Sequence, residues 1–425
     1  MMARPPLNDF TDGKVNPMMH ELASLHFDNL PRPDARTDVG RPGRELCLYP
    51  AKLGYDLQDE LDFLSNRAME PNVFFSARFL APAMPRIDER QIRMALIRDN
   101  KGTSSRMRLL MPFSVDKPGF AVGPSIIRVW ANNFGPLGTP LVDGEEAAET
   151  LDNLFEGLLQ HALQLPTTLV LPDVRLNGPF VRLAKAVAIG RNLPVTVANA
   201  YERPMLQSTE DALDYLAAAI SPAHLREMRR QWRQLESLGE LVYNVARQPS
   251  DIHRRMEEFM ALEAGGWKGK KRSAMVLDRH HAAFAREAIS NLASVDAVRI
   301  HTIDLDGKAI ASMIVLMMGG EAYTWKTAFD ESYARYSPGK LLMGELTEFQ
   351  LDDPNTVRSD SCAVADHPIM SRFWREREEM GTLVIGLTQN SDRDVRQAAA
   401  QLHMYRSTRN MAKALRDRIL SLTRR

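Results

Sequence analysis

The sequence is short of cysteine, of long apolar runs and of net charge. Its 425 residues hold only two cysteines, Cys47 and Cys362, which are too few and too far apart for a disulfide framework or a cysteine-based zinc site. The longest nearly apolar run covers residues 309–318, well short of the about 20 residues that a membrane-spanning helix needs. Lysine plus arginine and aspartate plus glutamate both total 54, so no overall charge attracts DNA or an anionic membrane.

These absences predict a cytoplasmic protein without a transmembrane segment and without a DNA partner. Residues 1–15 carry an early arginine but lack the apolar core of a secretory signal. No group of His, Cys, Asp and Glu has the spacing of a metal site, so we expect no metal cofactor. The composition is 44 % hydrophobic and 25 % charged, which is typical of a folded globular protein.

The length and the local patterns divide the chain into four parts. Residues 1–45 are rich in Pro, Asp, Gly and Arg without periodicity, which predicts a mobile N-terminal arm. Residues 46–200 and 201–390 each mix helical and strand patterns, and a chain of this length should form more than one core. Residues 391–425 predict an amphipathic C-terminal helix.

The two central parts resemble each other in layout. RMALIRDNKGTSSRMRLLMPF (93–113) and VRIHTIDLDGKAIASMIVLMM (298–318) both read as strand, turn with Asp and Gly, strand. The second hairpin continues through Gly319-Gly320 into a third strand at 321–329, so we expect an antiparallel meander. The chain therefore predicts an α/β (α+β) protein with two similar units, each a mixed, largely antiparallel sheet flanked by helices.

The segment from Tyr323 to Phe349 has the pattern of a strand, a tight turn and a helix. Residues 323–329 alternate, which predicts one buried face formed by Tyr323, Trp325, Thr327 and Phe329. After Ser-Pro-Gly at 337–339 the apolar spacing becomes helical. The first N–H groups of such a helix are unpaired and carry its positive dipole end, so the turn could bind an anion such as a pyrophosphate. An ordinary strand-to-helix turn is the alternative.

Four segments together resemble a known family. GWKGK (266–270), IDLDGKAIAS (303–312), YTWKTAFDESYARYSPGKLL (323–342) and SDSCAVADHP (359–368) resemble the Gcn5-related N-acetyltransferase (GNAT) superfamily. The resemblance is closest to the CelD-like branch associated with cellulose and exopolysaccharide synthesis, which is related to the FemAB aminoacyl ligases. RVWANNFGPLGTPL (128–141) resembles the first-half signature of the same branch.

The resemblance implies two such units in tandem, the first of which could be degenerate. It also implies an acyltransferase, most simply an acetyltransferase, that uses acetyl-CoA or another acyl-CoA as co-substrate. The acceptor would be a small molecule or a saccharide with an amine or hydroxyl group. The coenzyme pyrophosphate would lie on Ser337, Gly339, Lys340 and Leu341. The loop has one glycine where the superfamily usually has two, and Pro338 removes an N–H donor.

Five residues are candidates for substrate binding. Glu263, Trp267 and Lys268 follow a predicted helix that would border the acceptor cleft, and a solvated basic loop is the alternative. Trp325 lies on the strand that would open toward the acyl-pantetheine arm, although a core position is the alternative. Asp330 could orient an acceptor amine or cap the following turn.

Four residues are candidates for catalysis. Asp360 in VRSDSCA could be the general base or an acceptor anchor, because a carboxylate is poorly suited to a core strand. A structural hydrogen bond is the alternative. Lys326 could stabilise developing negative charge, His367 could relay protons near neutral pH, and Tyr336 could reprotonate the leaving thiolate.

The leading hypothesis is therefore direct attack of an acceptor on an acyl-CoA thioester. A second hypothesis is FemAB-like aminoacyl transfer from charged tRNA, which predicts a basic groove between residues 226–233 and 268–272. A third is a non-catalytic partner of a polysaccharide synthase.

Overall fold

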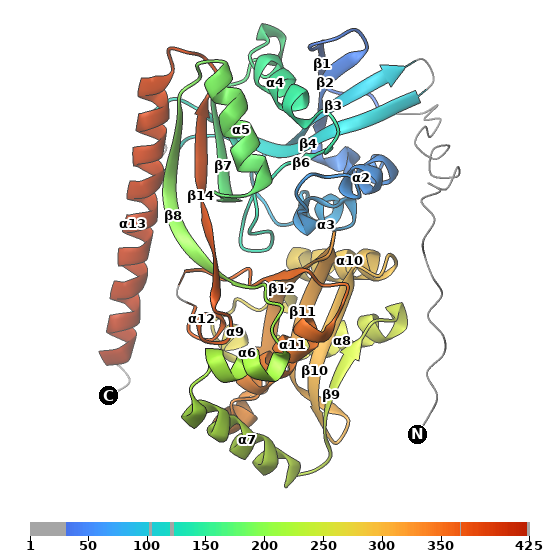
Figure 1. Ribbon diagram of the computed structural model, residues 1–425, viewed down its shortest axis with the longest axis vertical. Coiled ribbons are helices and arrows are strands. Elements are labelled where there is room, and N and C mark those ends of the chain that lie inside the picture. Colours follow the sequence, from blue (N-terminus) through green and yellow to red (C-terminus); the bar gives the residue numbers. More distant parts are fainter. Residues whose placement is uncertain (1–30, 102–103, 120–122, 366, 423–425) are drawn as a thin grey trace.

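The computed structural model describes residues 31–101, 104–119, 123–365 and 367–422 (Figure 1). One mixed 14-stranded sheet runs through this part of the chain. Its strands are β1 (Ala35–Asp38), β2 (Arg44–Pro50), β3 (Arg93–Lys101), β4 (Ser104–Asp116), β5 (Ile126–Val129), β6 (Leu141–Val142), β7 (Thr168–Arg175), β8 (Val195–Leu206), β9 (Leu241–Ala246), β10 (Val298–Leu305), β11 (Lys308–Met318), β12 (Glu321–Phe329), β13 (Arg358–Asp360) and β14 (Glu376–Gly386).

Helices flank the sheet on its two faces. The α-helices are α2 (Gln58–Ser65), α3 (Ala77–Ala83), α4 (Ala147–Gly157), α5 (Pro179–Gly190), α6 (Ala212–Ala219), α7 (Pro222–Glu236), α8 (Pro249–Gly265), α9 (Trp267–Lys270), α10 (Arg279–Ala293), α11 (Pro338–Asp352), α12 (Met370–Phe373) and α13 (Asp392–Leu422). Short 3-10 turns are η1 (Ala51–Gly54), η2 (Val73–Phe75), η3 (His161–Leu163), η4 (Met275–Leu277) and η5 (Glu331–Tyr336). The α/β class with a large mixed sheet between helices is thus confirmed.

The strand order is β1-β2-β3-β4-β5-β7-β14-β8-β13-β12-β11-β10-β9, with β6 paired to β4. Neighbours are antiparallel except β5 with β7 and β12 with β13, which are parallel. The hairpin β3–β4 and the meander β10–β11–β12 form as expected from their turns. Each half therefore contains an antiparallel run that ends in one parallel pair.

The two halves exchange strands at the middle of the sheet. β14 follows α12 in the second half of the chain, yet it lies between β7 and β8. The C-terminal end of β8 in turn pairs with β13 through Met205 and Leu206. No single cut of the chain separates two complete sheets, so the boundary at residue 200 remains a proposal.

Two large apolar cores pack against the sheet, and the first of them continues through both halves of the chain. One extends from α2 and α3 of the first half to α8, α10 and the strands that they cover, and includes Phe79, Phe284 and Trp325. The other lies under α6, α11 and α12 and includes Tyr215, Leu342 and Trp374. Burial of these two opposite apolar surfaces holds the α8–α10 layer and the α6–α12 layer on the sheet.

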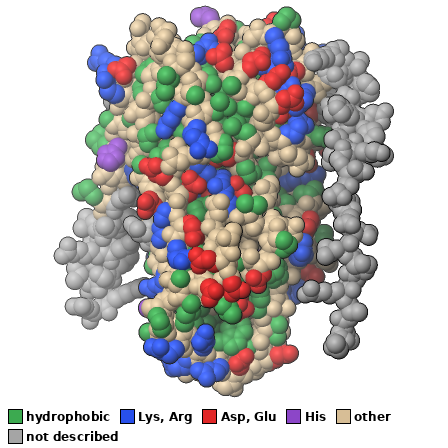
Figure 2. Space-filling view, viewed as in Figure 1, with side chains coloured by type: hydrophobic (Ala, Val, Ile, Leu, Met, Phe, Trp, Pro, Cys, Tyr) green, Lys and Arg blue, Asp and Glu red, His purple; other side chains and the backbone are tan. Residues whose placement is uncertain are grey.

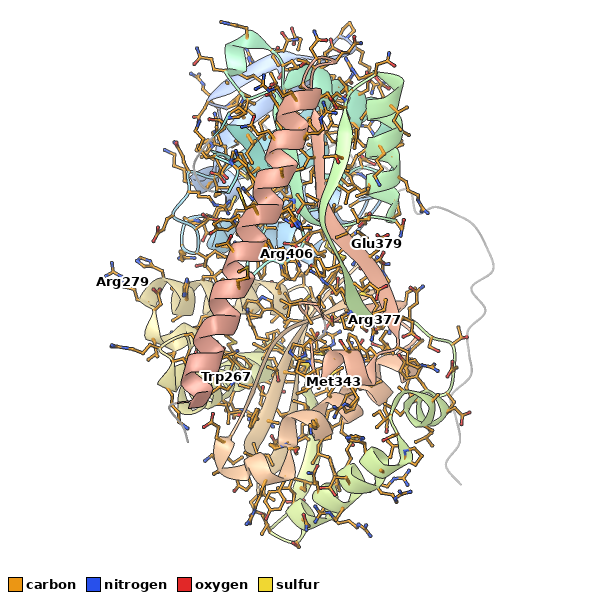
Figure 3. The ribbon with its side chains drawn as sticks, turned by 90° about the vertical axis from the view of Figure 1, so that its left-hand side faces the viewer. Trp267, Arg279, Met343, Arg377, Glu379 and Arg406 are labelled. Carbon is orange, nitrogen blue, oxygen red and sulfur yellow. The ribbon has the colours of Figure 1, made fainter. Side chains whose placement is uncertain are left out.

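The N-terminal end of the described chain joins the sheet. Residues 35–38, which were expected to belong to a mobile arm, form the strand β1 because their backbone pairs with β2. Residues 1–30 of that arm lie outside the described residues. α13 begins at Asp392, close to the expected helix, and crosses β8 and β14 with Arg406 on the crossing face (Figure 3). Within the described residues no helix combines the length and apolar character required to traverse a bilayer.

Candidate functional site

The strand β12 contains a bulge at Trp325. Its pairing with β11 passes from Val315 opposite Thr324 to Ile314 opposite Lys326, which leaves Trp325 as an extra residue. A bulge bends a strand and changes which face its side chains occupy. Tyr323 and Trp325 accordingly join the core under α8 and α10, whereas Phe329 packs against the core under α6 and α11. The prediction that residues 323–329 bury one common face is therefore wrong, because the side chains before and after the bulge pack against different cores.

Beyond Tyr323, β12 separates from β13. The parallel pairing ends where Tyr323 lies opposite Asp360, while β12 continues to Phe329. Cys362 then adopts a left-handed backbone conformation with φ 50°, which turns the chain away from the sheet. A hydrogen bond of 2.8 Å from the Thr324 hydroxyl to the Ser361 carbonyl marks the point of divergence. The edge of β12 after Thr324 thus has no partner strand on the β13 side in the described residues.

Lys326 lies at this open edge beneath a loop from the first half of the chain. Its Nζ donates a hydrogen bond of 2.9 Å to the Asn133 carbonyl and lies 4.7 Å from the centroid of the Phe134 ring. Burial, and then the positive charge of Lys268, lowers the pKa of Lys326 from 10.5 to about 8. A substantial fraction of this amine is therefore neutral in weakly alkaline solution, where it can accept a proton.

Glu263 and Lys268 stand next to Lys326. The buried carboxylate of Glu263 accepts hydrogen bonds from Lys268 Nζ at 2.7 Å and from the Met275 N–H at 2.7 Å. Lys268 Nζ also lies 3.4 Å from the carbonyl of Thr327 on β12. The structure thus brings Glu263, Lys268 and Lys326 to one edge of the sheet.

Trp325 is a core residue in this structure. Its exposed fraction is 6 %, and its ring makes edge contacts with Phe79 and Phe284. The indole N–H donates a hydrogen bond of 2.6 Å to the Phe134 carbonyl. Trp325 and Lys326 therefore anchor the same loop, and the role of Trp325 is to position that loop. The substrate-binding assignment of Trp325 gives way to the core alternative.

Trp267 and Asp330 lie at the border of this edge. Trp267 on α9 is 49 % exposed and lies beneath the ammonium of Lys271, 5.0 Å from the ring centroid. Asp330 caps η5, since its carboxylate accepts hydrogen bonds from the N–H and the hydroxyl of Ser332. These contacts favour the capping alternative for Asp330 and leave Trp267 available to a ligand.

The N-terminus of α11 offers fewer donors than the sequence predicts. Ser337 has a left-handed backbone with φ 52°, and its carbonyl accepts the N–H groups of Lys340 and Leu341 at 2.8 and 3.2 Å. Leu341 is also buried. Among the described residues, the N–H of Gly339 has no acceptor, so an anion here would bind one backbone N–H, the helix dipole and the Lys340 side chain.

Gly339 leaves space for a ligand at this turn. An added Cβ would lie 3.5 Å from the Phe329 ring, which is an ordinary van der Waals distance. The side chain of Ser337 contacts Gln231 of α7 at 3.4 Å, so α7 borders the turn from outside. The turn lies directly after β12 and η5, at the same end of β12 as Lys326.

Asp360 is an ion-pair partner at the junction of the two halves. Its fully buried carboxylate lies 3.3 Å from the Arg203 guanidinium and 3.5 Å from that of Arg175, and it accepts the Cys362 N–H at 2.7 Å. Burial alone would raise the pKa of Asp360, but Arg203 and Arg175 hold it below its usual value. A carboxylate held ionised in this way is a poor proton acceptor. These contacts favour the structural alternative for Asp360, and its assignment as the general base stays a prediction.

His367 and Tyr336 occupy separate surroundings. The Nδ1 of His367 accepts the Met370 N–H at 3.3 Å, and burial lowers the pKa of its ring. Tyr336 is buried in the core under α6 and α11, with its hydroxyl bonded to Arg335 at 2.5 Å. Among the described residues, no hydrogen bond, ion pair or ring contact joins either side chain to Lys326, so their catalytic roles remain predictions.

Sequence reasoning named none of the first-half residues individually, although Asn133 and Phe134 lie in the segment 128–141 that resembles the first-half signature. Asn133 and Phe134 contact Lys326 through a carbonyl and a ring, and Arg175 and Arg203 hold Asp360. An arginine within an otherwise apolar strand, as in TLVLPDVR, is a signal of a buried ion pair, but it does not name the partner. Among the described residues, no group of three or more His, Cys, Asp or Glu side chains could hold a metal ion.

The comparisons with known proteins concern the domain and the fold. Residues 223–355 match the model of the acetyltransferase (GNAT) domain. No curated protein matches the chain. The fold is similar to the C-terminal domain (DUF2156) of a proposed lysylphosphatidylglycerol synthetase from Agrobacterium fabrum, with a TM-score of 0.50 and 11 % identity over 81 % of this chain and 94 % of that one.

The fold is also similar to FemX, with a TM-score of 0.52 and 8 % identity over 80 % of this chain and 97 % of FemX. At such identities the likeness concerns the fold alone. Residues 223–355, from α7 to the end of α11, therefore match a GNAT acetyltransferase domain within a larger mixed α/β fold that resembles both structures.

Proposed function

We propose that this chain is an acyl-CoA-dependent N- or O-acyltransferase whose reaction takes place at the open edge of β12. The observation that carries the proposal is the separation of β12 from β13 after Tyr323, next to the α11 N-terminus. A thioester arm could lie along the unpaired edge, with its phosphate end at Gly339 and Lys340. The GNAT match over this segment supports an acyl donor of the CoA type.

The residues at the edge suggest a direct reaction. An acceptor amine or hydroxyl attacks the thioester carbon, the new C–N or C–O bond forms, and the C–S bond breaks to release the thiolate. Lys326 in its neutral form takes the proton of the acceptor and returns it to the thiolate. Glu263 and Lys268 would orient the acceptor, because their charges lie beside Lys326. Holding both substrates in one cleft supplies much of the rate.

Cys362 is not proposed as a nucleophile. Burial, and then the negative charge of Asp360, raises the pKa of its thiol well above the usual value. The thiol therefore stays protonated at neutral pH, and the thiolate is the reactive form. A mechanism through an acyl-cysteine would instead need surroundings that lower the pKa of the thiol.

Calorimetry with acetyl-CoA on the whole chain tests the donor assignment. Saturable binding at micromolar to millimolar ligand supports the proposal, and its absence at millimolar concentration would rule out acetyl-CoA. Turnover against a panel of amines and sugars then tests the reaction. Lys326→Met should abolish turnover, while Lys52→Met, at an exposed lysine of η1, should leave it unchanged. Equal background rates in all three proteins would favour the non-catalytic partner.

Aminoacyl transfer from charged tRNA remains the second candidate because of the arginines on α7. The side chains of Arg226 and Arg229 are exposed, and neither has a carboxylate partner among the described residues. Figure 2 shows basic side chains gathered at the lower end of the molecule, over α7. In the other basic segment predicted for tRNA binding, residues 268–272, Lys268 is paired with Glu263 and Lys270 with Glu331, so these two lysines are less available to phosphate groups. tRNA binding that falls steeply with salt would favour this candidate.

A further inference from the structure

A groove lies between α6, α7 and α11, on the outer side of the layer that covers the lower sheet. Its volume is about 750 Å³, within the range of small-molecule sites. Its walls are mainly apolar and include Leu216, Leu225, Met228 and Leu341. In Figure 2 this apolar area appears near the lower end of the molecule, with acidic side chains above it and basic ones below it.

Two carboxylates in the wall lack partners. Glu345 and Glu348 of α11 are half-buried, and neither makes an ion pair or a hydrogen bond with the described residues. Burial, and then the charge of Glu348, raises the pKa of Glu345 to about 6. Burial also raises the pKa of Glu348, with further repulsion from Asp352 and Asp211. Carboxylates in this state gain free energy from a cation that reaches them.

The opposite wall supplies an aromatic surface. Trp232 of α7 is half-buried in the groove, and its indole N–H is bonded to Glu236 at 2.8 Å, which fixes the ring. α7 and α11 approach closely, since a Cβ on Gly344 would lie 2.9 Å from Met228 Cε. An indole and aliphatic walls in the same groove as two carboxylates suit an amphiphilic amine, because the ring and the walls accept its apolar body and the carboxylates attract its ammonium.

We propose that the α6–α7–α11 groove binds an amphiphilic amine, with its ammonium at Glu345 and Glu348 and its apolar body against Trp232 and the aliphatic wall. The groove borders the N-terminal turn of α11 through Leu341, but the proposal does not depend on acyl transfer at the edge of β12. Arg229 and Arg233 line the mouth on α7 but are exposed, so their charges are screened by water. The two carboxylates would repel an anionic amphiphile, so we expect it to bind more weakly than an amine with the same apolar body.

A matched series of probes tests the charge requirement. Titration calorimetry with the whole chain compares 4-phenylbutylammonium, 4-phenylbutanol and 4-phenylbutanoate, which share one apolar body. The ammonium should bind at least about tenfold tighter than the carboxylate, and the alcohol should fall between them. Equal or tighter binding of the carboxylate, or no binding of the ammonium at millimolar concentration, would overturn the proposal.

Variants locate the site. Glu345→Gln with Glu348→Gln should weaken ammonium binding by about tenfold or more, and Trp232→Ala should weaken all three probes. Glu202→Gln removes an exposed carboxylate of β8 outside the groove and should leave binding unchanged. Circular dichroism melting confirms that each variant is folded. Undiminished binding in the folded double glutamine variant would overturn the proposal.

Discussion

Arg175 of β7 and Glu321 of β12 form a two-bond ion pair across the junction of the two halves, although 146 residues separate them. The two N–O distances are 2.7 and 3.2 Å, and both side chains are buried. Arg358 bonds the same carboxylate, as does the hydroxyl of Tyr323. The pair therefore fixes the start of β12, which leads to the open edge where the reaction is proposed.

Breaking this pair should destabilise the whole protein. Arg175→Met leaves Glu321 and Asp360 buried with less positive charge, and removing one partner of a buried pair typically costs about 3–5 kcal/mol. Urea unfolding followed by circular dichroism measures the change. Arg182→Met, at an exposed arginine of α5, is the matched control and should change stability little. A near-neutral Arg175→Met would show that the pair does not join the halves.

Asp360→Asn should affect stability more than catalysis. The substitution leaves Arg203 and Arg175 facing a neutral amide, so the melting temperature should fall by several degrees. If Asp360 is structural, the pH–rate profile of the folded variant keeps its shape. A folded variant that has lost turnover at every pH would restore Asp360 as the general base.

Lys326 should give the reaction a pH dependence. Turnover is expected to rise with pH up to about 8, where the amine becomes neutral, and to level off above it. The profile of kcat/KM from pH 6 to 10 measures this pKa in the free enzyme. A kcat/KM that still rises in proportion to hydroxide concentration at pH 10 would show that the pKa of Lys326 is not lowered.

The same group should affect stability in alkaline solution. Its pKa of about 8 in the folded state lies below 10.5, so the unfolded chain binds more protons between these values. Stability should therefore increase with pH across this interval for that group. Lys326→Met should remove this increment, which a comparison of urea midpoints at pH 7.5 and 9.5 can detect.

Gly339→Ala separates binding from folding. The space beside Gly339 accepts a methyl group, and alanine is favoured over glycine in a helix by up to about 1 kcal/mol. The melting temperature should stay the same or rise. If the phosphate end of the donor approaches the Gly339 N–H, the KM for acetyl-CoA should rise severalfold. An unchanged KM would place the donor elsewhere.

Local signals predicted many of the elements well. The hairpin turns at Asp306-Gly307 and Gly319-Gly320 fix the β10–β12 meander, and the carboxylate of Asp278 caps α10 by accepting hydrogen bonds from the N–H groups of His280 and His281. Such features depend on a few neighbouring residues, so the sequence alone can reveal them. Glu263 and Lys268 were candidates because they follow a predicted helix that would border the acceptor cleft.

The bulge at Trp325 shows where local reasoning fails. Alternation in 323–329 predicted one buried face, but an extra residue in β12 shifts the face after Thr324. That shift depends on the pairing with β11, which the seven residues do not encode by themselves. The contact of Lys326 with Asn133 likewise joins two residues that are 193 positions apart in the sequence.

By itself, the sequence determined the α/β class, the repeated layout of the two halves and the segment that carries the open edge. Periodicity, turn residues and short motifs are local properties, and they persist whatever the rest of the chain does. Only the tertiary structure decided that β14 lies between β7 and β8, that Asp360 is held by two arginines, and that the half-buried Lys326 lies against Phe134. These relations arise from packing between distant segments, where burial sets both the pairing of strands and the proton affinity of each charged group.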